Sequence, residues 1–196
     1  MALDAKKVYA PTPDQSPTTG AVAVADTGVT APTDAGSVLP SANWDEGGYV
    51  SEDGISLTVT RSTTPIRDWS KSVVRNLLTE FGGSIVCNFL QVDEFAAECM
   101  FGEDNVTVTV ATQTHGAQMK VGIGATLPPI KAFCFSMKDG NARVRVFVPR
   151  GQFTDVNQID FKPDAGLTFG GTIQTYDDGT GNSVYVMFDD GTVISG

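Results

Sequence analysis

The chain has 196 residues, 41% of them hydrophobic, and a formal net charge of −10. This length can bury a sizeable core within one domain, without disulfides or metals to support it. No run of 18 or more apolar residues occurs, which excludes a transmembrane helix, and the acidic balance argues against nucleic-acid binding, which needs clustered cations.

The residues that usually carry chemistry are few. Three cysteines (Cys87, Cys99 and Cys134) are widely spaced without a CxxC pair, and His115 is the single histidine. Buried thiols in a reducing compartment are a better interpretation than disulfides or a zinc site. Nucleophile-elbow, phosphate-loop and HExxH motifs do not occur. We therefore expect no enzyme activity, no cofactor and no bound metal.

The N-terminal part is polar and rich in turn-forming residues. Prolines and glycines recur between residues 8 and 43, and prolines remove backbone donors and fix φ. One short strand is predicted within this stretch, at Gly20–Ala25. We expect residues 1–43 to form an extended arm and residues 44–196 to form a single β-sandwich domain.

From Trp44 onward apolar residues follow patterns that are typical of strands. Segments that alternate with a period of two, and so predict half-buried strands, are Ile55–Thr60, Val106–Val110 and Val144–Val148. Segments that are apolar on both faces are Ile85–Leu90 and Val184–Phe188. A strand of the second kind needs cover on both sides, from a second layer or from a neighbouring subunit.

Turn and helix signals complete the pattern. Asp-Gly pairs at residues 53, 139, 178 and 190 predict the hairpin turns of a meander, because glycine supplies the positive φ of tight turns. One helix is predicted from Val92 to Phe101, with Asp93 at its start and Gly102 at its end. The expected fold is mostly β, a sandwich or barrel with one short flanking α-helix, an extended arm and loops.

Charge is distributed unevenly along the chain. The net charge is −6 over residues 1–60, +2 over residues 61–150 and −6 over residues 151–196. The acidic ends of one copy could dock on the basic middle of another, or they could serve only solubility. Arg143, Arg145 and Arg150 form a basic cluster, for which we expect ion pairs across a subunit contact rather than a nucleic-acid site.

Two tryptophans and one acidic loop are candidate sites. Trp44 and Trp69 border the arm and a polar loop, Arg61–Asp68. Aromatic residues beside mobile segments often anchor interfaces, and ordinary core packing is the equal alternative for each. Asp177–Asn182 offers oxygen ligands but lacks the bidentate Glu and the spacing of a calcium loop, so a turn is the better interpretation.

Several stretches in the middle of the chain carry a family resemblance. They are Gly47–Ile55; Asp68–Ser70 with Leu77–Phe81 and the helix at Glu94 and Phe95; and Phe135–Gly140 with Val148–Gln152. In combination they resemble the major tail protein, the tail-tube subunit, of long-tailed (siphovirus-type) bacteriophages of actinobacteria. The resemblance spans residues 44–152, and the acidic, strand-rich remainder is similar to the family pattern in a looser way.

The resemblance implies a β-sandwich with a flanking helix and a structural role in the virion tail. Subunits would close hexameric rings, and the rings would stack around the tape-measure protein through loops and terminal arms. The tube would also meet the tail terminator and distal tail proteins, and phage DNA would pass through its lumen without specific binding. Assembly would take place in the host bacterial cytoplasm, with no membrane as a partner.

The resemblance also assigns interface residues. By position, Arg61–Ser70 would be the stacking loop, and the arm before Trp44 would reach a neighbour. The loop residues expected at the interface are Arg61, Pro65, Ile66, Arg67, Asp68 and Trp69. Independently of the resemblance, the basic cluster predicts ion pairs at a subunit contact from Arg143, Arg145 and Arg150, and the position of Trp44 beside the arm makes it a candidate aromatic anchor.

Two other functions compete with a tail-tube subunit. One is another phage structural β-protein, such as a capsid decoration or tail-completion protein. The other is an acidic β-sandwich module that binds calcium or carbohydrate. Hollow tubes or six-fold rings would select the tube subunit, and a monomer stabilised by calcium would select the binding module.

Overall fold

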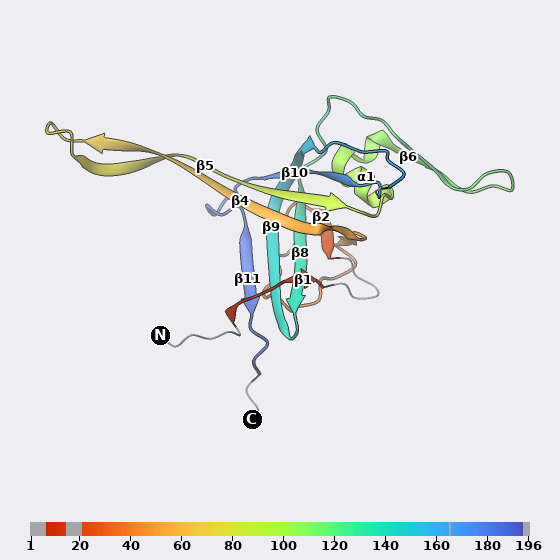
Figure 1. Cartoon of the computed structure of the whole chain (residues 1–196), viewed down its shortest axis with the longest axis horizontal. Coiled ribbons are helices and arrows are strands. Elements are labelled where there is room, and N and C mark those ends of the chain that lie inside the picture. The colour runs from red at the N-terminus through yellow and green to blue at the C-terminus, as the bar shows by residue number, and fades with distance from the viewer. Residues whose placement is uncertain (1–6, 15–20, 165, 194–196) are drawn as a thin grey trace.

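The computed structural model describes residues 7–14, 21–164 and 166–193, and their strands form one large and one small antiparallel sheet (Figure 1). The nine-stranded sheet has the order β3-β2-β8-β9-β10-β5-β4, with β1 also paired to β8 and β11 also paired to β9. Its strands are β1 (Thr12–Pro13), β2 (Val22–Asp26), β3 (Asp45–Glu46), β4 (Val50–Arg67), β5 (Val73–Phe89), β8 (Lys131–Asp139), β9 (Ala142–Val156), β10 (Phe169–Thr175) and β11 (Tyr185–Asp189). The second sheet contains β6 (Val106–Thr109) and β7 (Gln118–Val121), which follow a 3₁₀ turn, η2 (Glu103–Asn105).

The β8–β9 hairpin lies at the centre of the large sheet. Asp139 pairs with Ala142 across a two-residue turn, and Gly140 in this turn has φ 59°, as predicted for an Asp-Gly hairpin. β1 and β2 lie one after the other along the outer edge of β8, and β10 and β11 do the same along β9. Both edges of this hairpin are therefore paired by strands of the same chain.

The helix α1 (Glu94–Phe101) packs on one face of the sheet; it ends at Phe101 as predicted and begins at Glu94, two residues after the predicted start at Val92. The Asp93 carboxylate accepts a hydrogen bond from the Ala96 N–H at 3.0 Å. At the other end, the Gly102 N–H donates to the Glu98 carbonyl at 2.8 Å. Gly102 has φ 86°, a value that favours glycine and ends the helix there.

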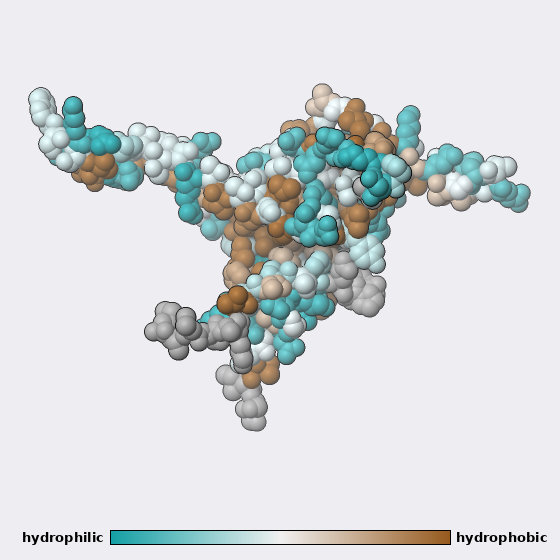
Figure 2. All heavy atoms as spheres, viewed as in Figure 1, coloured by the Kyte–Doolittle hydropathy of each residue, from teal (hydrophilic) through white to brown (hydrophobic). Residues whose placement is uncertain are grey.

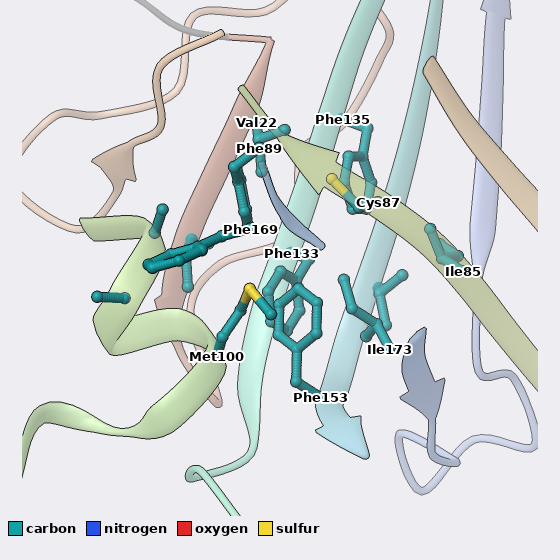
Figure 3. Close-up of a cluster of buried hydrophobic side chains, with 14 of the residues drawn as sticks. Val22, Ile85, Cys87, Phe89, Met100, Phe133, Phe135, Phe153, Phe169 and Ile173 are labelled. Atoms are coloured by element: carbon teal, nitrogen blue, oxygen red, sulfur yellow. The ribbon is translucent and has the colours of Figure 1, made fainter. Parts of the chain in front are cut away.

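The main core fills the space between α1 and the sheet (Figure 3). Its deeply buried members are Val22, Ile85, Cys87, Phe89, Met100, Phe133, Phe135, Phe153 and Ile173. Phe133 packs edge-to-face on Phe153, and Phe101 of the helix packs in the same way on Phe169, with 5.8 Å between ring centroids in each pair. The aromatic side chains therefore join the helix to the sheet.

The opposite face of β8 and β9 is covered as well. Trp44 is 3% exposed and packs edge-on against Phe147, with 6.1 Å between ring centroids. Small side chains of β2 and β8 complete this second cluster. Trp44 therefore packs in the core of its own chain. The central hairpin is thus apolar on both faces, and its own chain covers both.

Part of the predicted N-terminal arm belongs to the sheet. The short strand expected at Gly20–Ala25 is confirmed as β2, which pairs with β8 and has four of its five residues buried. Gly20 itself lies outside the described residues. β1 adds a two-residue pairing further along β8. The division of the chain into 1–43 and 44–196 stays a prediction.

Two hairpins leave the body in opposite directions (Figure 1). β4 and β5 form the longer one, whose half near Cys87 belongs to the sheet and whose other half projects outward. β6 and β7 form the shorter one. The alternating segment Val106–Val110 is a strand as predicted, but its residues from Thr107 onward are exposed rather than half-buried, because this hairpin stands away from the body.

Three of the four Asp-Gly pairs do not make the predicted hairpin turns. Asp53-Gly54 forms a bulge inside β4, where the pairing with β5 skips from Val50 to Ile55 and Gly54 has φ 65°. The pair at 178 lies between β10 and β11, which both pair with β9 rather than with each other. The pair at 190 follows β11, the last strand described.

The polar segment Arg61–Asp68 is a strand as far as Arg67, not a loop. Its threonines and Ile66 have partners on β5, and both residue types favour extended pairing. Pro65 is tolerated because β4 is the end strand of the sheet, where a missing N–H can face outward. Only the five residues after Arg67 turn the chain.

The prediction of a mostly β, sandwich-like fold with one flanking α-helix is confirmed. The large sheet is open rather than closed into a barrel, because β3 and β4 form its two ends. Within the ranges that the structure describes, α1 is the one α-helix, and no helix has the length and apolar character to span a membrane.

Candidate interaction surfaces

The projecting half of the β4/β5 hairpin has two bare edges. β10 pairs with β5 from Phe89 to Gly83, and beyond this point β4 and β5 pair only with each other in the described part of the chain. We call residues 60–82 the ribbon. Unpaired backbone N–H and C=O groups along such edges are a template on which a strand of another chain can pair.

One face of this hairpin remains apolar beyond the body. The cross-strand partners on that face are Leu57 with Ile85, Val59 with Gly83, Arg61 with Phe81 and Thr63 with Leu78. Partners share a face, as do alternate residues of a strand, so this face continues that of the buried Ile85. Its exposed apolar side chains, which we call the apolar stripe, are Leu57, Val59, Leu78 and Phe81. The core face therefore extends past the cover that the chain itself provides (Figure 2).

Polar side chains dominate the other face of the ribbon. Ser62 donates a hydrogen bond to Glu80 across the strands at 3.3 Å. Ile66 and Leu77 add apolar atoms to this face near the tip. On the apolar face, the Arg61 guanidinium lies 5.7 Å from the centroid of the Phe81 ring, a cation–π contact that partly covers the stripe.

The tip of the ribbon, residues 68–72, is a structured turn. The Asp68 carboxylate accepts hydrogen bonds from the Ser70 hydroxyl at 2.7 Å and from the Ser72 N–H at 2.9 Å, and these two bonds hold the pKa of Asp68 below its ordinary value. Arg67 closes the turn by donating to the Lys71 carbonyl at 2.9 Å. Trp69 projects from this turn and is fully exposed.

The ribbon is basic in an otherwise acidic protein. Its charged residues are Arg61, Arg67, Lys71 and Arg75 against Asp68 and Glu80, a net charge of +2. With −10 for the whole chain, the remaining residues carry −12. The ribbon therefore combines two properties, exposed apolar side chains and positive charge, that suit a contact with an acidic surface.

All six residues predicted for the stacking loop lie on this one projection. Arg61, Pro65, Ile66 and Arg67 belong to β4, and Asp68 and Trp69 belong to the turn. Their role in a subunit contact stays a prediction. The apolar stripe is not visible in the sequence, because two bulges in the pairing of β5 interrupt its period-two pattern.

The other predicted interface residues all contact their own chain. Arg143 forms an ion pair with Asp14, with 2.6 Å between Nη1 and Oδ2. Arg145 is 5% exposed and donates to two backbone carbonyls of the segment between β2 and β3. Arg150 donates to a backbone carbonyl of the β10–β11 loop. A subunit contact for these arginines and for Trp44 stays a prediction.

A groove of about 370 Å³ lies between the N-terminal segment and the start of β4. Its walls are residues 11–13, Ala21–Val22, Val50–Ile55 and Phe135–Met137. Ser51 contributes to these walls, and its hydroxyl is buried without a hydrogen-bond partner among the described residues. Segments far apart in sequence form the groove, so no local sequence motif predicts it.

The candidate reactive or metal-binding side chains are either buried or already hydrogen-bonded within the chain. Burial raises the pKa of the Cys87 thiol to about 12 and that of Cys134 to about 11, which makes both poor nucleophiles. In the Asp177–Asn182 loop, hydrogen bonds led by the Tyr185 hydroxyl lower the pKa of Asp178 to about 2. Across the described ranges, no three His, Cys, Asp or Glu side chains are grouped so as to hold a metal ion.

Comparison with protein families gives a match that covers nearly the whole chain. A family model described as "Phage tail tube protein" matches residues 10–194. No curated protein matches the sequence. The matched range includes every strand of both sheets, the ribbon and the groove.

Proposed function

The chain belongs to the phage tail tube protein family, and on this basis we propose that it is the major subunit of a tail tube assembled from identical copies. Membership gives it a structural role in the virion tail, in a family that is not a family of enzymes. The proposal adds the arrangement: closed rings, six copies in each, stacked into a hollow tube.

The observation that carries this proposal is the ribbon. The apolar stripe and the bare strand edges are costly in water and are left uncovered by the protomer. A second copy can cover the stripe and extend the sheet from the outer edge of β4. A contact of this surface with a different part of the next copy can be repeated from copy to copy, which gives an assembly rather than a pair.

The proposed partners follow from the tube. The tape-measure protein would fill the lumen during assembly in the host cytoplasm, and the tail terminator and distal tail proteins would bind the two ends. Phage DNA would then pass through. The net charge of −10 per copy supports this last step, since a lumen of negative sign repels phosphates and lets DNA slide without sticking.

Electron microscopy of the concentrated, purified chain tests the proposal. Hollow tubes or stacked six-fold rings are the expected result. Trimers would instead favour a capsid decoration protein. A chain that stays monomeric at millimolar concentration in all buffers would contradict the proposed assembly.

A further inference from the structure

We propose that the tip of the ribbon in one copy inserts Trp69 into the groove between the N-terminal segment and β4 of a second copy. This inference rests on the proposed self-assembly and adds the two surfaces that meet. Neither surface is completed within the protomer: the Trp69 side chain is fully exposed, and the groove is open.

The tip of the ribbon holds Trp69 on a hydrogen-bonded turn, with its indole ring exposed. The Asp68 carboxylate, the Ser72 N–H and the Arg67 guanidinium are all engaged in hydrogen bonds within the turn, so its backbone is held in one shape. A turn whose backbone is already fixed loses little conformational entropy on binding. Tryptophan is also among the residues that most often dominate the binding energy of interfaces.

The groove suits an indole ring in size and lining. Its volume of about 370 Å³ is near the lower end of the range, about 300–1,000 Å³, found for pockets that bury small organic groups. Pro11, Pro13, Ile55 and Met137 supply apolar and polarisable walls. The buried Ser51 hydroxyl has no partner among the described residues, so this wall is incomplete in the isolated chain.

The charges of the two surfaces are complementary. Arg67 and Lys71 flank Trp69 at the tip. Glu52 and Asp53 belong to the lining of the groove, and neither is in an ion pair with the residues that the structure describes. Opposite charges around an aromatic anchor would orient the tip and accelerate its docking.

The two surfaces lie at opposite ends of β4. The groove is at the Asp53-Gly54 bulge and the tip follows Arg67, a separation of roughly 45 Å along an extended strand. A contact between different ends of the same element is head-to-tail, so each docking leaves a free tip and a free groove. Such a contact propagates along a stack instead of ending in a dimer.

The groove is complete only when the N-terminal segment is paired with β8. Residues 11–13 of this segment form one wall, and they are held on β8 by the β1 pairing and by Asp14, whose carboxylate is 2.6 Å from Arg143 and 3.1 Å from Lys138. A chain whose N-terminal segment is detached lacks this wall. Seating of the segment in one copy therefore prepares the site for the next copy.

Site-specific photo-crosslinking tests the contact. Trp69 is replaced by benzoylphenylalanine, an aromatic residue of similar bulk, and the full-length variant is assembled with a tenfold excess of the unmodified chain. After irradiation, mass spectrometry identifies the crosslinked peptides. The expected adducts join position 69 to residues 11–13, 50–55 or 135–137 of another copy. Adducts confined to other regions, or none in tubes that contain the variant, would overturn the proposal.

This design separates the two hypotheses. Unmodified chains that form no tubes contradict the proposed function, whereas tubes whose crosslinks avoid the groove contradict only the docking of Trp69. A second measurement compares Trp69→Ala with Phe161→Ala, which removes another exposed aromatic side chain, outside both the ribbon and the groove.

The docking predicts unequal effects of these two substitutions. Trp69→Ala raises the protein concentration required for assembly at least about 30-fold, and Phe161→Ala changes it less than about threefold. Combining Trp69→Ala with Asp53→Lys gives an effect smaller than the product of the two single effects, because both act on one contact. Equal effects of the two alanine variants, or fully multiplicative effects in the double variant, would refute the docking.

Discussion

The two long hairpins of this protein differ in the source of their cover. In β8–β9, strands of the same chain pair with both edges and other parts of the chain bury both faces. In β4–β5, the half beyond Gly83 keeps both edges bare, and the apolar stripe that runs onto it from the body is exposed. Apolar strands therefore show that cover is needed, and only the three-dimensional arrangement shows whether the chain or its neighbour supplies it.

The largest predicted difference concerns folding of the unassembled chain. Phe133→Ala removes a fully buried ring at the centre of the core and should lower the free energy of unfolding by about 3–5 kcal/mol. Phe81→Ala removes a ring that is 45% exposed on the ribbon and should cost less than about 1 kcal/mol. Urea denaturation followed by circular dichroism measures both. Similar costs would show that the ribbon is part of the core of the monomer.

For assembly, in contrast to folding, substitutions on the ribbon should have the larger effect. Leu78→Asp places a charge on the apolar stripe, and burial of that charge against a neighbour should raise the concentration needed for tube formation at least about 100-fold. The matched control is Thr64→Asp, which puts the same charge on the other face of the ribbon. Light scattering measures both, and monomer stability should stay nearly unchanged. If Thr64→Asp is as damaging as Leu78→Asp, the apolar face is not the contact face.

The two tryptophans report on the same contrast, because one lies in the core and the other on the ribbon. Trp44→Phe leaves Trp69 as the single indole, and Trp69→Phe leaves Trp44. In the unassembled chain, acrylamide should quench the exposed Trp69 several times more efficiently than the buried Trp44. Assembly should protect Trp69 and leave Trp44 as it was. Equal quenching in the monomer would contradict the positions described for the two side chains.

The smallest expected effect is electrostatic. Burial, and then repulsion by Glu94, Glu103 and Asp45, raises the pKa of Glu98 in the folded chain. The folded state binds this proton more tightly than the unfolded state, so the ionised side chain is destabilising at neutral pH. Glu98→Gln should stabilise the chain by roughly a few tenths of a kcal/mol at pH 7. Thermal melts should show this gain shrinking as the pH falls toward the ordinary value of 4.5, through the raised pKa of the folded state, and vanishing below it. A gain independent of pH would exclude this cause.

Local signals predicted the local structure well. Three features depend only on neighbouring residues and are found as predicted. They are the caps of the helix at Asp93 and Gly102, the strand β2 and the turn at Gly140. The Asp53-Gly54 pair has the same sequence as the turn at 139 and forms a bulge, since the strand to which it belongs continues past it. A dipeptide specifies its φ angles but not the pairing of the strands around it.

The interaction surfaces depend on distant pairings and were predicted only in part. The sequence shows the basic middle of the chain. It also singles out the segment before Trp69, but predicts a loop where the structure has a strand. The apolar stripe exists only in the register of β4 with β5, and the groove only when β1, β4 and β8 meet. Trp44 and Trp69 carry the same sequence signal, yet one is buried and the other exposed.

The pairing of β2 with β8 sets an order of events during synthesis. Ala25 pairs with Ala132, and Arg145 binds the carbonyl of Asp34 across 111 residues of sequence. At about 5–20 residues per second, the first strand leaves the ribosome roughly 5–20 seconds before its partner exists. During that wait it is an unprotected apolar edge, flanked on both sides by prolines, which lack the N–H needed to extend a β ladder.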